Sequence, residues 1–420
     1  MITKRIAALK KAPIEHDRVG AVLPEYRSVS APGSVTLYME VDSPEPAIYK
    51  GLLTCEKGET VRTGQKISLS EDSGRYVIST ITGTVSSISI HTGDFGRSYI
   101  AIAIDAEGEE AFDEQFKKVA LNPTLETARN FLSCAPGRPP LHASFGPEKS
   151  IQTIVVCGVD NDIFLSTNRY GATTQFNAIK KGIHILKDIT GVDKIILAVP
   201  QDLIQGYTGV DAIVKAVPIQ YPDTLPQMMI QYLLGQVVPV GKQVEDLGIS
   251  FFSAEAAESI GIAFTEGRIP VSKRLTLIGK NGNTTILSVR IGTPLRDIFR
   301  ASNIVLNEKD RIVLGGPMRG TAIYSEGHTV LPETNAVMVQ DKNNLPYVSD
   351  NPCINCGECV RICPAKIQIN MLVRYLEAGH YEEAADQYDL HSCIECGLCS
   401  FVCVSKMPIF QYIRLAKFEL

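Results

Sequence analysis

The chain of 420 residues has no tryptophan, no long apolar run and no excess of basic residues. Without about 18 consecutive apolar residues, the sequence predicts no transmembrane helix. The N-terminal stretch MITKRIAALKKAP lacks an apolar core and a cleavage site, so it does not predict a signal peptide. A net charge of −5 gives no indication of nucleic-acid binding. These absences predict a cytoplasmic protein that is either soluble or peripheral on a membrane.

The sequence contains 11 cysteines, and eight of them lie near the C-terminus. Two runs share the spacing C-x-x-C-x-x-C-x-x-x-C, one over residues 353–363 and one over 393–403. This spacing resembles that of bacterial-type ferredoxins, in which the fourth cysteine of each run ligates the other run's [4Fe–4S] cluster. The predicted ligands of one cluster are Cys353, Cys356, Cys359 and Cys403. The predicted ligands of the other are Cys393, Cys396, Cys399 and Cys363.

The two runs form one internal repeat with a period of 40 residues, the separation of Cys353 from Cys393. Glycines 357 and 397 match, as expected where the backbone turns tightly against a cluster. Lys366 and Lys406 each lie three residues after the last cysteine of their run. Two interpretations of these lysines stay open: they offset the negative charge of a cluster, or they are solvated helix residues.

Zinc sites and disulfides are the alternatives for eight such cysteines. Zinc sites usually group cysteines in pairs and not in triplets plus one. Disulfides need an oxidising compartment, which nothing in the sequence indicates. Two clusters that share the same cysteine runs lie close enough to exchange electrons, so the spacing predicts an electron relay. The lone Cys55, Cys134 and Cys157 are predicted to be structural.

The first third of the chain divides by pattern into three segments. Residues 1–28 lack strong periodicity and are predicted to be an arm that packs on another domain or on a partner. Residues 29–105 contain short runs rich in Val, Ile and Thr between glycine-containing turns, which predicts an all-β domain. Residues 106–150 are acidic and then rich in proline and glycine, which predicts a linker.

Residues 151–265 predict a Rossmann-like α/β domain. Strands over 151–156, 194–199 and 216–219 alternate with helices over 173–190 and 202–214, an order that implies a parallel sheet with right-handed crossovers. Ligands bind at the carboxyl ends of such strands. Gly158, Asp160 and Asp162 follow the first strand and are therefore candidate cofactor-binding residues. Helix capping and turn formation are the alternative roles for the two acids.

The last two segments predict an α+β domain and a helical module. Residues 266–340 contain two to four strands and one short helix, including a hairpin that turns at Asn281-Gly282, which is a small β-grasp pattern. Residues 345–420 hold the cysteine runs and helical patterns over 369–388 and 409–420, which predicts an α-helical ferredoxin. The predicted fold is multidomain, with α/β and α+β parts.

Together these motifs resemble the RnfC family, which is component C of the Rnf electron-transport complex and is related to the flavin subunit of respiratory complex I. The resemblance is carried by the cysteine runs and by three further motifs: Gly58-Glu59-x-Val61-x-x-Gly64, Ile291-Gly292-Thr293-Pro294 and Gly315-Gly316-Pro317-Met318. It implies a barrel-sandwich hybrid over 29–105, lipoyl-like but with no carrier lysine in the hairpin at 70–76. It also implies a flavin-subunit-like domain over 151–265, a β-grasp domain of the soluble-ligand-binding (SLBB) type over 266–340, and the dicluster ferredoxin.

The resemblance further implies an electron-transfer subunit that oxidises NADH through FMN and is peripheral on the inner face of the cell membrane through partner subunits. Three departures fall in the flavin site. Residues 140–147 read PLHASFGP where the family has Gly-Gly-Ala-Gly-Phe-Pro, and residues 159–162 read VDND where it has Glu-Cys-Glu-Pro. Tyr221-Pro222-Asp223 lacks the glycines that follow in the family. These departures predict that FMN and NADH binding is lost or altered.

Three functions remain open at this point. The first is a relay through two [4Fe–4S] clusters, between a protein donor and a protein acceptor, without FMN or NADH. The second is an NADH-oxidising, FMN-containing subunit that passes electrons to ferredoxin or quinone partners. The third is a structural or assembly protein whose clusters do not change redox state. Bound flavin separates the first two, and reducible clusters separate both from the third.

Overall fold

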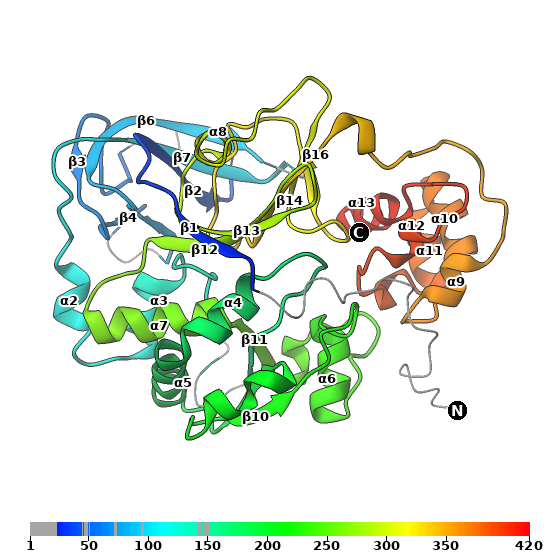
Figure 1. The fold of residues 1–420 in the computed structure, drawn as a ribbon, viewed down its shortest axis with the longest axis horizontal. Helices are drawn as coiled ribbons and strands as arrows, with labels where there is room; N and C mark the ends of the chain where they lie inside the picture. Colours follow the sequence, from blue (N-terminus) through cyan, green and yellow to red (C-terminus); the bar gives the residue numbers. More distant parts are fainter. Residues whose placement is uncertain are drawn as a thin grey trace.

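The computed structural model describes residues 23–43, 45, 49, 51–70, 74–93, 96–141, 145 and 151–420. In these residues the fold is mixed α/β, with sheets of six, four, four and two strands. Figure 1 shows the sheets gathered into one body, with the helical C-terminal module at one side of it. The body supplies one wall of the site described below.

The first sheet is antiparallel, in the order β2-β7-β6-β3. Its strands are β2 (Ser34–Val41), β3 (Thr60–Val61), β6 (Gly83–Thr92) and β7 (Ser98–Ala106), and the short pair β4 (Lys66–Ser68) and β5 (Tyr76–Ile78) completes this part. Buried and less buried residues alternate along β2, because successive side chains of a strand point to opposite faces. The predicted strands of this segment are present in its described residues. Residues 71–73 of the hairpin predicted to lack a carrier lysine lie outside the described residues.

The segment predicted to be a linker contains two helices, α2 (Gln115–Val119) and α3 (Leu125–Leu132). Thr124 caps α3 by accepting a hydrogen bond from the Thr127 N–H at 3.0 Å. Ala128 and Leu132 are fully buried in the largest hydrophobic core. The composition of 106–150 indicated irregular structure, but the four-residue spacing of these two apolar side chains favours a helix.

The second sheet is entirely parallel, in the order β10-β9-β8-β11, which confirms the parallel prediction. Its strands are β8 (Thr153–Cys157), β9 (Lys194–Val199), β10 (Ile213–Ala216) and β11 (Ile249–Ser253). Its helices are α4 (Thr167–Thr174), α5 (Phe176–Thr190), α6 (Pro226–Leu234) and α7 (Ala254–Glu266), with the 3-10 turn η4 (Glu245–Leu247) before β11.

Two element predictions in this part are wrong. The helix predicted over 202–214 is a 3-10 helix, η3 (Gln201–Tyr207), because Gly209 has a φ of +75° and turns the chain out of the helix. The strand predicted over 216–219 is β10, which ends at Ala216. Pro218 has no N–H to donate and cannot extend the ladder. The helix predicted over 173–190 begins at Phe176, after the separate helix α4.

The third sheet has the order β1-β13-β12-β16-β14-β15. Its strands are β1 (Glu25–Ser28), β12 (Ser272–Ile278), β13 (Thr284–Arg290), β14 (Arg311–Leu314), β15 (Thr321–Ile323) and β16 (Ala336–Gln340), with helix α8 (Leu295–Ala301) between β13 and β14. The predicted hairpin is confirmed, since β12 and β13 pair antiparallel and Gly282 has a φ of +78°. Residues 266–340 hold five strands and not two to four, because β15 is only three residues long and β16 pairs with the distant β12.

Strand β1 comes from the segment predicted to be an arm. It pairs in parallel with β13, from Glu25 against Thr285 to Ser28 against Ser288. The described end of this segment therefore packs on another part of the same chain. Residues 1–22 lie outside the described residues.

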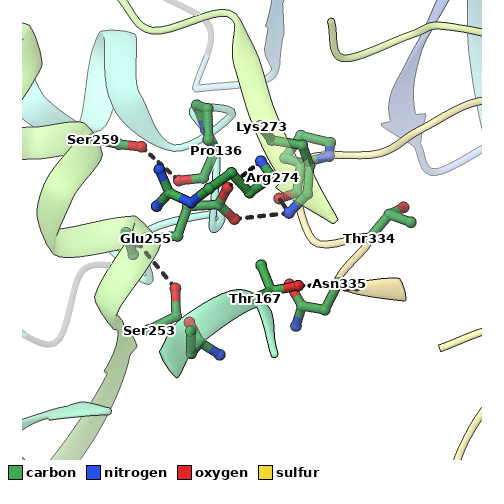
Figure 2. Close-up of polar contacts among 12 residues, drawn as sticks. Pro136, Thr167, Ser253, Glu255, Ser259, Lys273, Arg274, Thr334 and Asn335 are labelled. Atoms are coloured by element: carbon green, nitrogen blue, oxygen red, sulfur yellow. Dashed lines mark hydrogen bonds and ion pairs between the residues drawn. The ribbon is translucent and has the colours of Figure 1, made fainter. Parts of the chain in front are cut away.

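Buried ion pairs tie the parallel sheet's helix α7 to strand β12 (Figure 2). Lys273 Nζ lies 2.8 Å from Glu255 Oε2, and their side chains are 0% and 4% exposed. Glu255 Oε1 also accepts the Arg274 backbone N–H at 2.7 Å, and the Arg274 guanidinium pairs with Glu258. Buried charges are tolerated when they are paired and hydrogen-bonded. These pairs fix the two sheets relative to each other, and the loops of both sheets form the junction described below.

The C-terminal module contains α9 (Glu358–Ile362), α10 (Ile369–Glu377), α11 (Tyr381–Tyr388), α12 (Leu398–Phe401) and α13 (Ile409–Glu419), with 3-10 turns η5 (Lys342–Asn344) ahead of it and η6 (Leu390–Ser392) within it. The helix predicted over 369–388 is two helices, because Gly379 has a φ of +77° and interrupts it. Among the residues that the structure describes, no helix is long and apolar enough to cross a membrane.

Candidate iron–sulfur site

The first predicted ligand set lines one cavity of the module. We call this the outer site, and its thiols belong to Cys353, Cys356, Cys359 and Cys403. Burial, together with the nearby thiols of the other three cysteines of the set, raises the pKa of Cys359 to about 11. Cys356 is exposed and Cys353 is half-buried. The first and last of these four cysteines, Cys353 and Cys403, are 50 residues apart in the chain. The structure brings all four together at one surface cavity.

The second predicted set also converges. We call this the inner site, and its thiols belong to Cys363, Cys393, Cys396 and Cys399. Burial, together with the nearby Cys363 thiol, raises the pKa of Cys393 to about 11 and of Cys396 to about 12. Burial also raises the pKa of Cys399, with the other three thiols adding to the effect. Each predicted set therefore gathers in space with the fourth cysteine taken from the opposite run.

Both runs fold in the same way around their site. Gly357 and Gly397 have φ values of +77° and +71°, and the residues two positions earlier, Asn355 and Glu395, are also left-handed. Lys366 and Lys406, with φ near +60° and +55°, donate their backbone N–H to the carbonyls of residues 363 and 403 at 3.2 Å each. Both lysines therefore occupy turns, so the alternative that they are solvated helix residues does not hold.

The thiol sets fit [4Fe–4S] clusters better than a single metal ion. In the described parts of the chain, no three His, Cys, Asp or Glu side chains converge on a point where one ion would bind. A cubane places each thiolate on a different iron, so its ligands surround a cavity and do not meet at a point. The raised pKa values of five of these thiols, those of Cys359, Cys363, Cys393, Cys396 and Cys399, indicate that ionising them is unfavourable without iron. Bound iron would supply the positive charge that stabilises the thiolates.

The inner site lies against the body of the protein. Tyr221, Leu225 and Met318 are buried in one hydrophobic cluster with Cys396 and Leu398. The outer site is flanked by Ile354 and Val404, which are 64% and 59% exposed. One site is therefore packed against the rest of the chain, and the other has exposed side chains beside it.

A buried carboxylate organises the wall that covers the inner site. Asp162 accepts hydrogen bonds from the backbone N–H groups of Met318 at 3.2 Å and Arg319 at 2.8 Å. A Cβ on Gly316 would lie 2.4 Å from Asp162 Cγ, so the turn requires glycine there. The Met318 carbonyl in turn lies so close to Gly397 that a Cβ on this glycine would be 2.3 Å from the oxygen. The loop after β8, the turn after β14 and the inner cysteine run are thus in direct contact.

The candidate cofactor residues have structural partners. Asp160 accepts the N–H groups of Asn168 at 2.8 Å and Arg169 at 3.1 Å, in the first turn of α4. Burial raises the pKa values of Asp160 and Asp162 to about 6, and their backbone donors oppose the rise. A Cβ on Gly158 would meet Val199 Cγ1 at 2.8 Å. These contacts are the capping and turn roles that were left open for the two acids. Residues 142–144 and 146–147 of the altered connector lie outside the described residues.

Sequence reasoning missed three residues of the inner site. Tyr221 donates its hydroxyl to the Cys396 carbonyl, Arg319 Nε donates to the Glu395 carbonyl at 3.2 Å, and Lys417 Nζ donates to the Cys393 carbonyl at 2.7 Å. A signal for Lys417 was available in the repeat, because the position 40 residues earlier is Glu377, which has the opposite charge. Tyr221 and Arg319 approach from other parts of the chain, and no local pattern indicates them.

Comparison with known proteins shows what this chain is similar to. The model of the "4Fe-4S dicluster domain" matches residues 345–404. Component C of the proton-translocating ferredoxin:NAD(+) oxidoreductase complex of Clostridium ljungdahlii is 26% identical over 87% of this chain and 84% of that protein. Component C of the Na(+)-translocating complex of Acetobacterium woodii is 24% identical over 78% of this chain and 79% of that protein. The resemblance to the RnfC family is confirmed.

Other matches cover a smaller share of the matched protein. The chain covers half the length of component C of the ion-translocating oxidoreductase complex of Pseudomonas aeruginosa, to which it is 27% identical over 87% of its own residues. Among solved structures, an NAD+-reducing [NiFe]-hydrogenase in the H2-reduced state matches with a TM-score of 0.47 and 14% identity, over 72% of this chain and 64% of that one. A likeness of that size carries no functional information.

Proposed function

We propose that this chain is an iron–sulfur electron-transfer subunit of an Rnf-type or related membrane-associated oxidoreductase complex. Its outer and inner sites would each hold one [4Fe–4S] cluster and relay electrons between them. The observation that carries the proposal is the convergence of eight cysteines into two sets of four, each set drawing its fourth thiol from the other run. The dicluster family match and the RnfC-type relatives support it.

The two sites suggest where electrons enter and leave. The outer site has an exposed cysteine and exposed apolar neighbours, so a protein donor or acceptor would exchange electrons there. The inner site contacts the body, which would connect it to the rest of the complex. We place the subunit on the inner face of the cell membrane, held there by partner subunits, as the family resemblance implies; the names of the relatives, which are subunits of ion-translocating complexes, support a membrane association.

We infer that FMN and NADH binding, which the family resemblance implies, is lost. The carboxylates that stand where the family has its acidic motif, Asp160 and Asp162, are both hydrogen-bonded to backbone N–H groups of this chain. The connector retains one glycine, at position 146, where the family has three. A backbone with fewer glycines cannot approach a flavin phosphate as closely.

An anaerobic titration of the purified protein tests the proposal. Dithionite should bleach the visible absorption of the clusters, NADH should not, and the acid extract should contain no flavin. Bleaching by NADH together with released FMN would show instead an NADH-oxidising subunit. Clusters that dithionite cannot reduce would identify a structural protein and overturn the relay.

A further inference from the structure

Three side chains converge on the backbone carbonyls of the inner cysteine run. Lys417 Nζ on α13 donates to the Cys393 carbonyl at 2.7 Å, and Arg319 Nε in the turn after β14 donates to the Glu395 carbonyl at 3.2 Å. The Tyr221 hydroxyl, before α6, donates to the Cys396 carbonyl. Three separate elements thus place hydrogen-bond donors on consecutive parts of this run.

The donors also bring positive charge to a buried site. Reduction of a [4Fe–4S] cluster adds one negative charge, which burial disfavours. The nearby Lys417 ammonium and Arg319 guanidinium favour the more negative state, and in a poorly solvated site this effect is larger than in water. The Glu395 carboxylate, 3.0 Å from Lys417 Nζ, opposes part of it. Hydrogen bonds, charge and solvent exposure are the terms by which a protein sets a cluster potential.

The outer site lacks this arrangement. The position that matches Lys417 in the repeat is Glu377, which carries a negative charge. The outer run does have a donor, since Arg361 Nη2 donates to the Cys356 carbonyl at 3.0 Å. Arg361 is exposed and paired with Glu358, so solvent and its partner weaken its field. Tyr221 and Arg319 belong to the body, outside the repeat.

We infer that Lys417, Arg319 and Tyr221 are positioning residues that raise the reduction potential of the inner cluster, which rests on the proposed iron–sulfur function. Burial alone would make the inner cluster the harder one to reduce. The three donors counter that effect on one cluster only. They keep the inner cluster reducible by electrons that pass through the exposed outer cluster.

The test is an anaerobic redox titration of the full-length protein, in which electron paramagnetic resonance follows each cluster. Lys417→Met should shift one cluster to lower potential and leave the other unchanged, and Tyr221→Phe should shift the same cluster by a smaller amount. Lys417→Arg, which keeps the charge, should restore most of the potential. The matched control Glu377→Gln, at the exposed repeat position that corresponds to Lys417, should leave the potential of the inner cluster unchanged.

The outcomes separate the inference from the function on which it rests. Two cluster signals in the wild type, with potentials that Lys417→Met and Arg319→Gln leave unmoved, overturn the inference and leave the relay intact. A shift of both clusters by equal amounts also overturns it, because the donors contact only the inner run. A wild-type protein without [4Fe–4S] signals overturns the function as well. If Lys417→Met fails to assemble its clusters, the Arg319→Gln and Tyr221→Phe titrations decide.

Discussion

Gly397 is one of the residues at which the inner cysteine run touches the body, and Gly397→Ala should separate the two. A Cβ at this position would lie 2.3 Å from the Met318 carbonyl oxygen, a backbone atom held in place by the Asp162 turn. The chain contains its own control in Gly357, the matching residue of the repeat. There a Cβ would lie 3.2 Å from Arg361 Nη1, the flexible end of an exposed side chain. Both glycines have φ near +75°.

The expected magnitudes follow from what each added methyl group meets. An alanine in the left-handed conformation costs about 1–2 kcal/mol at either position. At position 397 the inner cysteine run must also move away from the Met318 carbonyl. This movement breaks the hydrogen bonds that Tyr221 and Arg319 donate to the run. A neutral hydrogen bond contributes about 0.5–1.5 kcal/mol and one from a charged donor about 1.5–3 kcal/mol. Gly397→Ala should therefore weaken the junction by about 3–6 kcal/mol, against about 1–2 kcal/mol for Gly357→Ala.

Amide hydrogen exchange of the holoprotein measures this difference locally. The excess of about 2–4 kcal/mol predicts exchange that is about 30- to 1000-fold faster in the turn at 315–320 in Gly397→Ala than in Gly357→Ala. Exchange in α5, far from the junction, should be unchanged and reports that the body is intact. Equal acceleration in the two variants would refute the reasoning, because it would mean that the Met318 contact does not hold the module to the body.

Further predictions concern the ion pairs, the ligands and the clusters. Lys273→Met should cost about 3–5 kcal/mol in urea unfolding, because it leaves Glu255 charged and buried, and adding Glu255→Gln should recover part of the loss. Cys403→Ser should remove the more solvent-accessible cluster and with it about half of the bound iron, and Cys363→Ser should remove the other cluster. Loss of the same cluster in both variants would contradict the crossed ligand sets. Chelation of the iron should make residues 345–420 sensitive to protease and leave the body resistant, because a module this small needs its clusters to complete its core; equal resistance before and after chelation would count against this.

The parts of the molecule that the sequence predicted are those whose signal is local. The alternation along β2 and the Asn281-Gly282 turn each specify their structure within a few residues. The crossed cysteine sets were also predictable, although they join residues far apart in the chain. Their spacing is dictated by cluster geometry and not by the surrounding fold.

The junction was not predictable, because its contacts have no local signature. Asp162 and Met318 are 156 residues apart, and Tyr221 and Cys396 are 175 apart. Asp160 and Asp162 stood out as short acids after a strand, but their partners are backbone N–H groups that any sequence provides. Two of the misplaced elements have simpler causes. Gly209 and Pro218 end regular structure at positions where apolar periodicity alone predicts that it continues.

The repeat explains why the inner and outer sites are alike, and the junction with the body explains why they differ. A 40-residue repeat gives two sites with the same turn conformations, so by itself it would make two equivalent clusters. The symmetry is broken by the body, which covers one site with Tyr221 and the Met318 turn and leaves the other open. It is broken again by a single charge reversal, Glu377 against Lys417, on matching helices. If the two sites hold the proposed clusters, these asymmetric contacts would give the clusters different reduction potentials and different access to a protein partner.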